Sequence, residues 1–147
     1  MPLGGRSEER RDRPAGSAHG RRARPDLQPA GDRPAGADRI LVVAKSLSTR
    51  AAGLVADGGY PAVWLTPLLD DPVSVAGLER RTAPALLVGG TADPTWNGPL
   101  ARRLSGDVLE LKGVDHGFGE RGDDPKQTLD NLKQVVKAVT AFAARAG

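Results

Sequence analysis

The sequence contains no cysteine in its 147 residues, which excludes a disulfide framework, a thiolate metal site and a cysteine nucleophile. Histidine occurs only as His19 and His116, so a histidine-rich metal site is not expected. No apolar run approaches the roughly 20 residues that a membrane-spanning helix needs, and the N-terminus has no apolar signal core. We therefore expect a cytoplasmic protein that holds no metal and has no membrane partner.

The first 38 residues are poor in large apolar side chains, since only Met1, Leu3 and Leu27 are of that kind. Prolines and glycines are scattered through the segment without a repeat, and its arginines lie among acidic residues. Such a segment cannot bury enough apolar area to offset the entropy of ordering it. We predict that residues 1–38 form a disordered tail.

Two interpretations of this tail differ in function. An arginine-rich arm that binds nucleic acid is one of them. However, the net charge of the chain is only +3, and the arginines of the tail are roughly balanced by acids. We favour the second interpretation, a solvated tail or the by-product of a mis-assigned start or a reading-frame slip, and we expect no nucleic-acid partner.

From Arg39 onward, apolar runs alternate with segments that carry helix signals. Short continuous apolar runs are typical of strands buried on both faces, and Pro and Gly mark the ends of the segments between them. The strands are expected within 39–45, 60–69, 83–94 and 107–118, and the helices within 48–59, 70–82, 97–106 and 124–147. This alternation predicts one α/β domain over residues 39–147, with a mostly parallel sheet of about four strands between helical layers.

The last segment has the clearest helix signals. Asp124 is a typical N-cap, and Pro125 suits the first helical position. Large apolar side chains follow at helical spacing and predict an amphipathic helix whose apolar stripe they form: Leu129, Leu132, Val136, Val139 and Phe142.

Three residues that could cooperate in catalysis follow three of the predicted strands. Ser46 follows the first strand, Asp93 the third and His116 the fourth. In a parallel sheet the chemistry is found at the carboxyl ends of the strands. A serine hydroxyl becomes a nucleophile when an imidazole takes its proton and a carboxylate orients that imidazole. Each residue alone has a plain structural interpretation, as a helix cap, a turn or a surface loop, but the three together predict a Ser-His-Asp triad.

The residues around Ser46 fit a sharp turn from a strand into a helix. Such a turn is strained and crowds the positions two before and two after the serine, so both positions need small residues. Ala44 and Ser48 satisfy this size rule, although both replace a glycine of the G-x-S-x-G pattern. The N-cap of the following helix would be Ser48 or Thr49.

The segment from about Arg39 to the end resembles the C-terminal half of an α/β-hydrolase, nearest to the small, lidless members that are similar to dienelactone hydrolase. The stretch "AKSLST" resembles their nucleophile turn, "LLVGGTADP" the strand and turn that carry the acid, and "GVDHGF" the loop that carries the histidine. The order Ser, Asp, His along the chain is also that of this fold. The resemblance implies an esterase-like serine hydrolase for an ester or other acyl substrate, with Ser46 as nucleophile, Asp93 as orienting acid and His116 as general base.

The resemblance also implies that the backbone N–H of Leu47 supplies half of an oxyanion hole. Lys45 is expected at the rim of the substrate site or in solvent. Trp96 either lines an acyl or aryl pocket or packs as an ordinary core residue, whereas Trp64, inside a strand, is expected in the core. The serine mechanism needs no cofactor, so none is expected.

Three other carboxylates compete with Asp93 for the role of the orienting acid. Asp115 adjoins His116, but adjacent residues point apart, which makes it the weaker candidate. Asp70 and Asp71 end the second strand, where some hydrolases place their acid, and we rank them second.

The four predicted strands match only the last half of the family's sheet, which has roughly eight strands. The earlier strands, and the loop with the second oxyanion donor, would precede Arg39, where the tail contains nothing similar. The strand at residues 40–44 would then be an apolar edge that is open to self-association. Two hypotheses follow: a working hydrolase, completed by self-association across that edge, or an inactive truncated hydrolase that acts, if at all, as an interaction module.

Overall fold

The structure, a computed structural model, describes residues 39–119 and 124–146. The tail for which the sequence predicts disorder, residues 1–38, lies outside the described residues. None of the described helices combines the length and the apolar composition that crossing a bilayer requires.

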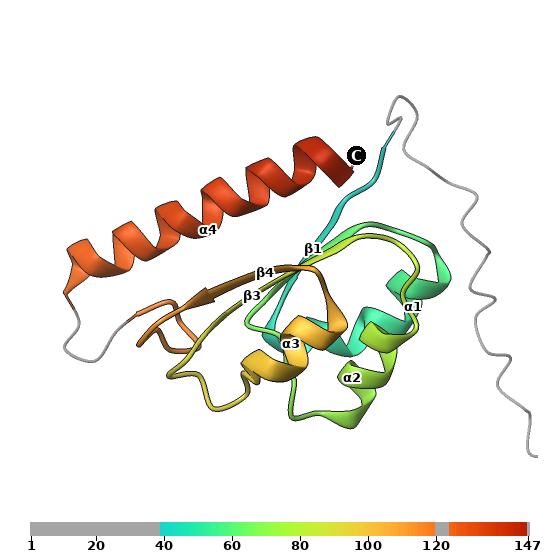
Figure 1. The fold of residues 1–147 in the computed structure, drawn as a ribbon, viewed down its shortest axis with the longest axis horizontal. Coiled ribbons are helices and arrows are strands. Elements are labelled where there is room, and N and C mark those ends of the chain that lie inside the picture. The colour runs from blue at the N-terminus through green and yellow to red at the C-terminus, as the bar shows by residue number, and fades with distance from the viewer. Residues whose placement is uncertain (1–38, 120–123, 147) are drawn as a thin grey trace, which may run out of the picture. The chain divides into compact units, whose positions relative to one another are not determined.

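Four parallel strands form one sheet in the described part of the chain. They are β1 (Val42–Lys45), β2 (Ala62–Leu65), β3 (Ala85–Gly90) and β4 (Asp107–Leu111), and they lie side by side in chain order. Because every neighbouring pair is parallel, all four carboxyl ends lie at the same edge of the sheet (Figure 1). The predicted α/β fold is confirmed, with strands that are shorter than the apolar runs that predicted them.

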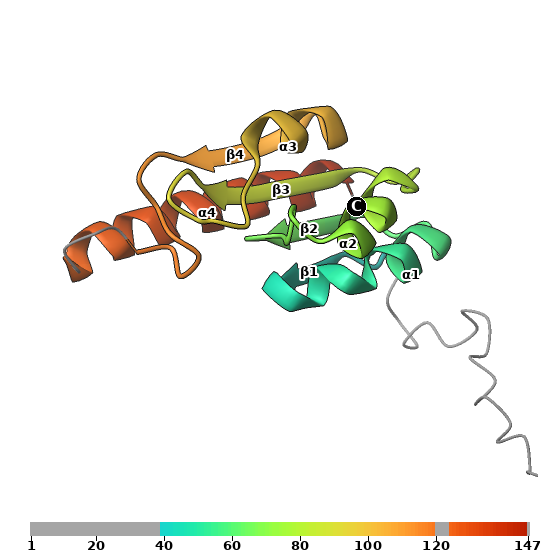
Figure 2. The same ribbon diagram turned by 90° about the horizontal axis from the view of Figure 1, so that it is seen from below.

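Helices cover both faces of the sheet, which gives the predicted three layers (Figures 1 and 2). Three α-helices and one short 3-10 helix lie on one face: η1 (Ser46–Ala51), α1 (Ala52–Asp57), α2 (Pro72–Glu79) and α3 (Gly98–Leu104). The long helix α4 (Pro125–Ala146) lies on the other face. The 3-10 helix η1 begins at Ser46, two residues before the start of the helix that the sequence predicts, and the α-helix α1 follows it from Ala52.

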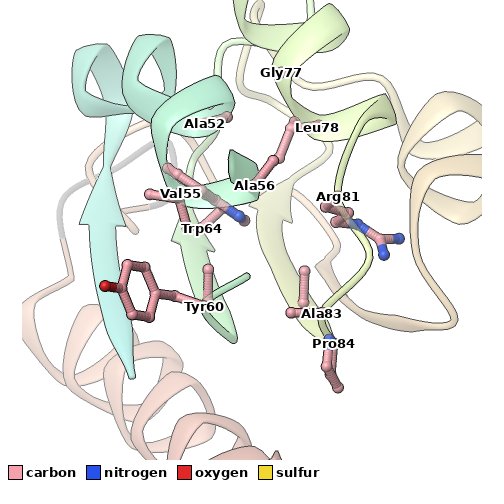
Figure 3. A pocket seen from close by; sticks show the side chains of 12 residues that line it. Ala52, Val55, Ala56, Tyr60, Trp64, Gly77, Leu78, Arg81, Ala83 and Pro84 are labelled. Atoms are coloured by element: carbon pink, nitrogen blue, oxygen red, sulfur yellow. The ribbon is translucent and has the colours of Figure 1, made fainter. Parts of the chain in front are cut away.

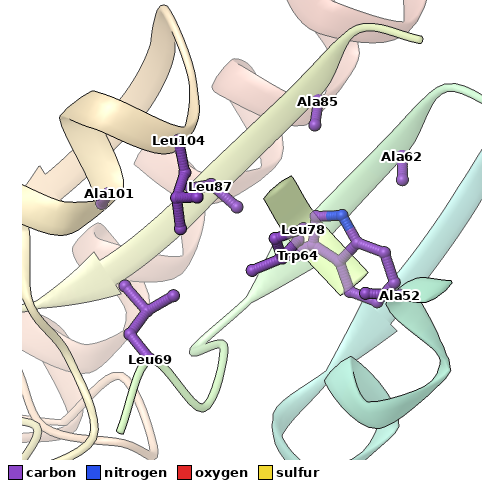
Figure 4. Packing of buried hydrophobic residues seen from close by; sticks show 9 residues of the cluster. All are labelled: Ala52, Ala62, Trp64, Leu69, Leu78, Ala85, Leu87, Ala101 and Leu104. Atoms are coloured by element: carbon purple, nitrogen blue, oxygen red, sulfur yellow. The ribbon is translucent and has the colours of Figure 1, made fainter. Parts of the chain in front are cut away.

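Two apolar clusters, one on each face, hold the layers together. On the face of α1, α2 and α3, the sheet contributes Trp64 and Leu87, and α2 contributes Leu78 (Figure 4). On the face of α4, the sheet side chains pack against Val135 and Phe142 of that helix. Trp64 is 2% exposed, so its predicted place in the core is confirmed.

The helix predicted at the C-terminus is confirmed, but its predicted apolar stripe is wrong in part. Phe142 is buried and Val139 packs against the core. By contrast, Leu129, Leu132 and Val136 are 53%, 39% and 63% exposed.

The buried face of α4 includes a polar residue instead. Asn131 is 2% exposed, and its side-chain amide donates a hydrogen bond of 3.2 Å to the backbone carbonyl of Phe118. A satisfied amide is tolerated in a core, so Asn131 can share the buried side of α4 with Val135 and Phe142.

β1 borders the sheet, and its only strand neighbour within residues 39–119 and 124–146 is β2. Val43 of β1 is 53% exposed, whereas Val63, its partner in β2, is fully buried. The apolar edge that the sequence predicts at the first strand is therefore present.

Asp71 caps α2 and links it to η1. Its carboxylate accepts hydrogen bonds from the backbone N–H and the hydroxyl of Ser74, at 2.9 and 2.7 Å. The guanidinium of Arg50 donates two more, at 2.9 and 3.3 Å. These bonds, that of Arg50 first and those of Ser74 next, hold the pKa of the Asp71 carboxyl well below its usual range.

We expect Asp71→Ala to lower the melting temperature at neutral pH by roughly a few degrees, because it removes the cap and the ion pair together. Asp71→Asn keeps the capping oxygen and should cost less. Because the folded state depresses the pKa of Asp71, its charge stabilises the fold fully above the unfolded pKa of about 4, and this contribution is lost as the pH falls below that value. Thermal unfolding of the wild type and of Asp71→Asn across the acid range checks this: a gap in melting temperature that does not shrink would contradict it.

Candidate active site

Ser46 lies at the sharp turn between β1 and η1. Its φ angle is 54°, in the left-handed region that a residue with a side chain rarely adopts. The Thr49 hydroxyl donates a hydrogen bond of 2.6 Å to the Ser46 carbonyl and accepts one of 3.3 Å from the Leu68 N–H. Thr49, predicted as an alternative N-cap, is therefore the residue that fastens the strained turn to the chain after β2.

Asp93 follows β3, and its side chain is fully buried. One carboxylate oxygen, Oδ1, accepts hydrogen bonds from the backbone N–H and the hydroxyl of Thr95, at 2.9 and 2.8 Å. The other oxygen, Oδ2, lies 2.8 Å from Nδ1 of His116. The sequence reasoning missed Thr95. A Thr two residues after an Asp nevertheless signals a turn in which the carboxylate accepts a hydrogen bond from the residue two positions later.

His116 lies in the loop after β4, and its side chain is 35% exposed. Its Nε2 atom lies 2.7 Å from Oγ of Ser46. Hydrogen bonds tie the loop to its neighbours: the Ala92 N–H donates to the Val114 carbonyl at 3.0 Å, the Gly113 N–H donates to the Thr91 hydroxyl at 2.8 Å, and Nζ of Lys45 donates to the His116 carbonyl at 3.0 Å.

The structure thus brings together the three residues of the predicted triad, from the ends of three strands. An imidazole between a hydroxyl and a buried carboxylate can accept a proton at Nε2 while its Nδ1–H donates to the carboxylate. This arrangement suits the activation of the Ser46 hydroxyl as a nucleophile.

The competing carboxylates have other partners or lie exposed. Oδ1 of Asp115 accepts hydrogen bonds from the N–H groups of Gly117 and Gly119, at 2.8 and 3.0 Å, and so shapes the loop. Asp71 binds Ser74 and Arg50, as described above, and Asp70 is exposed. The contact to the His116 ring is made by Asp93 alone among these four aspartates.

Leu47 and Lys45, the residues on either side of Ser46, are the next two predicted site residues. Leu47 follows Ser46 directly, with a side chain that is 66% exposed. Its N–H is at the start of η1, where helix N–H groups have no acceptor within the helix. Nζ of Lys45 binds the His116 carbonyl and lies 5.7 Å from the centre of the Phe118 ring.

Trp96 has structural contacts in the described residues. Its indole N–H donates a hydrogen bond of 2.8 Å to Glu110, and its ring packs over Gly89 of β3. It also packs against the cluster on the face of α1, α2 and α3. Its predicted role in a substrate pocket stays a prediction.

A hollow at the opposite end of the sheet does not belong to this site. It lies under α1 and α2, near the beginnings of β2 and β3, and its lining includes Ala62, Trp64, Arg81 and Ala85 (Figure 3). Its cavity volume is about 10 Å³, which holds at most one water molecule. Burial lowers the pKa of Arg81, and its Nε atom has no hydrogen-bond partner there.

Comparison of the sequence with protein-family models and with curated proteins finds no match. Within the described ranges, no group of three or more His, Asp or Glu side chains is arranged to hold a metal ion. The site is therefore interpreted from the chemistry of its own residues.

Gly90, the last residue of β3, allows the histidine loop to approach the sheet. A Cβ atom on Gly90 would collide with the backbone carbonyl of Val114, two residues before His116. We expect Gly90→Ala to lower the melting temperature and to displace the imidazole from Ser46, because the backbone at Val114 must move to make room for the added Cβ. Gly106→Ala is the matched control, since nothing lies within 4 Å of its added Cβ.

Thermal unfolding and the NMR signals of the His116 ring measure the two effects of Gly90→Ala separately. Equal melting temperatures and unchanged ring signals for both variants would show that the close approach does not position the loop.

Proposed function

We propose that the chain is a serine hydrolase of the α/β-hydrolase type that cleaves an ester or another acyl compound. One observation carries the proposal: Oγ of Ser46, the ring of His116 and the carboxylate of Asp93 form a continuous chain of contacts of 2.7 and 2.8 Å. The strained backbone of Ser46 supports it further, because strain of this kind projects a nucleophile away from its strand. The order of the three residues along the chain agrees with the resemblance to that family.

In the first half of the proposed reaction, the Ser46 oxygen attacks the acyl carbon while its proton moves to Nε2 of His116. The positive imidazole is stabilised by the buried carboxylate of Asp93 through Nδ1–H. When the tetrahedral intermediate collapses, the bond to the leaving alcohol breaks, and the proton on Nε2 passes to that alcohol. The product of this half is an acyl ester on Ser46.

In the second half, water replaces the alcohol. His116 takes a proton from the water, the resulting hydroxide attacks the acyl carbon, and the Ser46 oxygen leaves with the proton from Nε2. The acid is released and the three side chains return to their starting state. No cofactor takes part in these steps.

The negative oxygen of each intermediate needs hydrogen-bond donors. Leu47 supplies one, since its backbone N–H follows the nucleophile at the start of η1. The second donor of the family would come from a loop before Arg39, outside the described residues. Loss of one donor typically lowers the rate about 100- to 1000-fold, so we expect a slow enzyme if no other group replaces it.

The second hypothesis, an inactive truncated hydrolase that acts as an interaction module, is favoured by the open edge at β1. It predicts folded protein whose Ser46 does not react. The two hypotheses therefore differ in one measurable property, the reactivity of this hydroxyl.

We expect a fluorophosphonate probe to label the wild-type chain at Ser46, with labelling at least about 1000-fold slower in Ser46→Ala and in His116→Ala. Ser48→Ala is the matched control, because Ser48 is an exposed hydroxyl two residues away and its loss should leave the labelling rate nearly unchanged. Mass spectrometry of the labelled peptide identifies the site. Absence of labelling in protein with native circular dichroism would contradict the hydrolase and favour the module.

Thr95 should matter for this reaction although it does not touch the substrate. We expect Thr95→Val to slow labelling about tenfold, because it removes a hydroxyl that donates to the Asp93 carboxylate. Thr95→Ser keeps the hydroxyl and loses the methyl group, and it should retain most of the wild-type rate. If the methyl group were what matters, the Ser variant would be the slower of the two. Equal rates in the Val and Ser variants would count against this role.

A further inference from the structure

The outer edge of β1 presents backbone groups that can form hydrogen bonds. The Val42 N–H donates to the Pro61 carbonyl at 3.0 Å, and Val42 is in register with Ala62 of β2. In a parallel ladder, the N–H and C=O of one residue both point to the strand on one side, and those of the next residue both point to the other side. Val42 and Ala44 therefore bond toward β2, whereas the backbone groups of Leu41, Val43 and Lys45 face away from the sheet.

Val43 adds an apolar side chain to this edge. Val42 and Ala44 pack on the face of α1, α2 and α3, and Leu41 packs on the face of α4. Because side chains alternate along a strand, Val43 lies on the same face as Leu41. It is 53% exposed.

This edge lacks the features that usually prevent pairing between chains. Exposed edge strands are commonly protected by proline, by bulges or by several charged side chains. Residues 40–44 contain neither proline nor charge. Lys45 is the one charged residue of β1, and its ammonium group is already bound to the His116 carbonyl.

We propose that β1 pairs with β1 of a second copy of this chain, antiparallel and centred on Val43. A twofold axis perpendicular to the sheet then relates the copies and joins their two sheets into one. Val43 of each copy exchanges both backbone hydrogen bonds with Val43 of the other, and Leu41 does the same with the second copy's Lys45. All outward groups of the edge strand are satisfied, and the two exposed valines pack against each other on the face of α4.

Charge selects this register over its neighbours. Shifting the centre to Val42 would place Arg39 opposite the second copy's Lys45, and like charges directly opposite each other destabilise a pair of strands. Shifting the centre to Ala44 would leave the outward N–H and C=O of Leu41 without a partner, because they would lie beyond the end of the second copy's β1. The register centred on Val43 pairs Lys45 with an apolar residue, Leu41, whose side chain can pack along the lysine stem.

A second copy suits this edge better than the chain's own first 38 residues. Those residues directly precede β1, but Met1, Leu3 and Leu27 are their only large apolar side chains. They contain no short apolar run that could continue the sheet. The strand that matches the edge in length and apolar character is β1 itself.

The register can be tested with charges at position 43, because the proposed axis places this residue opposite itself. Sedimentation equilibrium of the whole chain should detect a dimer that dissociates on dilution. Val43→Lys alone and Val43→Glu alone should each raise the dissociation constant about fivefold or more. An equimolar mixture of the two variants should regain association as a heterodimer, since opposite charges then face each other.

The matched control is Val136→Lys, because Val136 is an exposed valine on α4 and not part of β1. It should leave the dimer unchanged. Val43→Pro, which removes only an outward N–H and is compatible with an edge strand, should abolish association while the circular dichroism stays native.

A wild-type monomer at all concentrations would overturn the proposal. So would a mixture of the Lys and Glu variants that associates no better than either alone, because the register would then be different. Loss of the dimer in Val136→Lys would assign the contact to α4 and not to β1.

Discussion

The parallel alignment of four strands decides where the three side chains of the proposed triad lie. Each helical connection returns the chain to the same starting end of the sheet, so all carboxyl ends share one edge. Ser46 and His116 are 70 positions apart along the chain, yet they are in hydrogen-bond contact because both lie beyond the carboxyl end of a strand, Ser46 directly after β1 and His116 in the loop after β4. If β4 ran antiparallel to β1, its carboxyl end, and His116 with it, would lie at the opposite edge of the sheet.

Close backbone packing then sets the distances at this edge. Gly90 lets the loop with His116 lie against β3, and the strained turn at Ser46 is fastened by Thr49. Asp93 is a buried charge, which is tolerated only when its oxygens have partners. Thr95 and the imidazole provide them. Burial, strain and hydrogen bonding are thus parts of the same arrangement, since the two bonds from Thr95 hold Oδ1 of the carboxylate whose other oxygen contacts His116.

The same arrangement leaves one side of the sheet incompletely covered. A helix is about 10 Å wide, whereas four strands spaced by about 4.8 Å span roughly 14 Å between their axes. One helix, α4, therefore cannot cover the whole face on which it lies, and Val43 stays exposed beside the buried Val63. Because Ser46 directly follows β1, any partner that pairs with this strand binds next to the proposed nucleophile.

The layered α/β fold, and the approach of Ser46, Asp93 and His116 to one edge of its sheet, could be predicted from the sequence. Short apolar runs between helix signals leave few arrangements other than a covered parallel sheet, and a serine, an aspartate and a histidine that each follow a strand must approach one edge of it. The apolar edge at β1 could be predicted in the same way, because residues 1–38 contain no apolar run like those that predict the four strands.

Only tertiary contacts decided which side of α4 is buried, because its apolar residues cover a wider arc than one sheet contacts. The buried side includes Asn131, which is bonded to Phe118, and excludes Leu129 and Val136. The contact of Lys45 with the His116 carbonyl belongs to the same class. It joins the end of β1 to the loop after β4, and spacing along the chain does not specify how such distant segments meet. The bonds from Thr95 to Asp93 are local by contrast, and the spacing of these two residues could have indicated them.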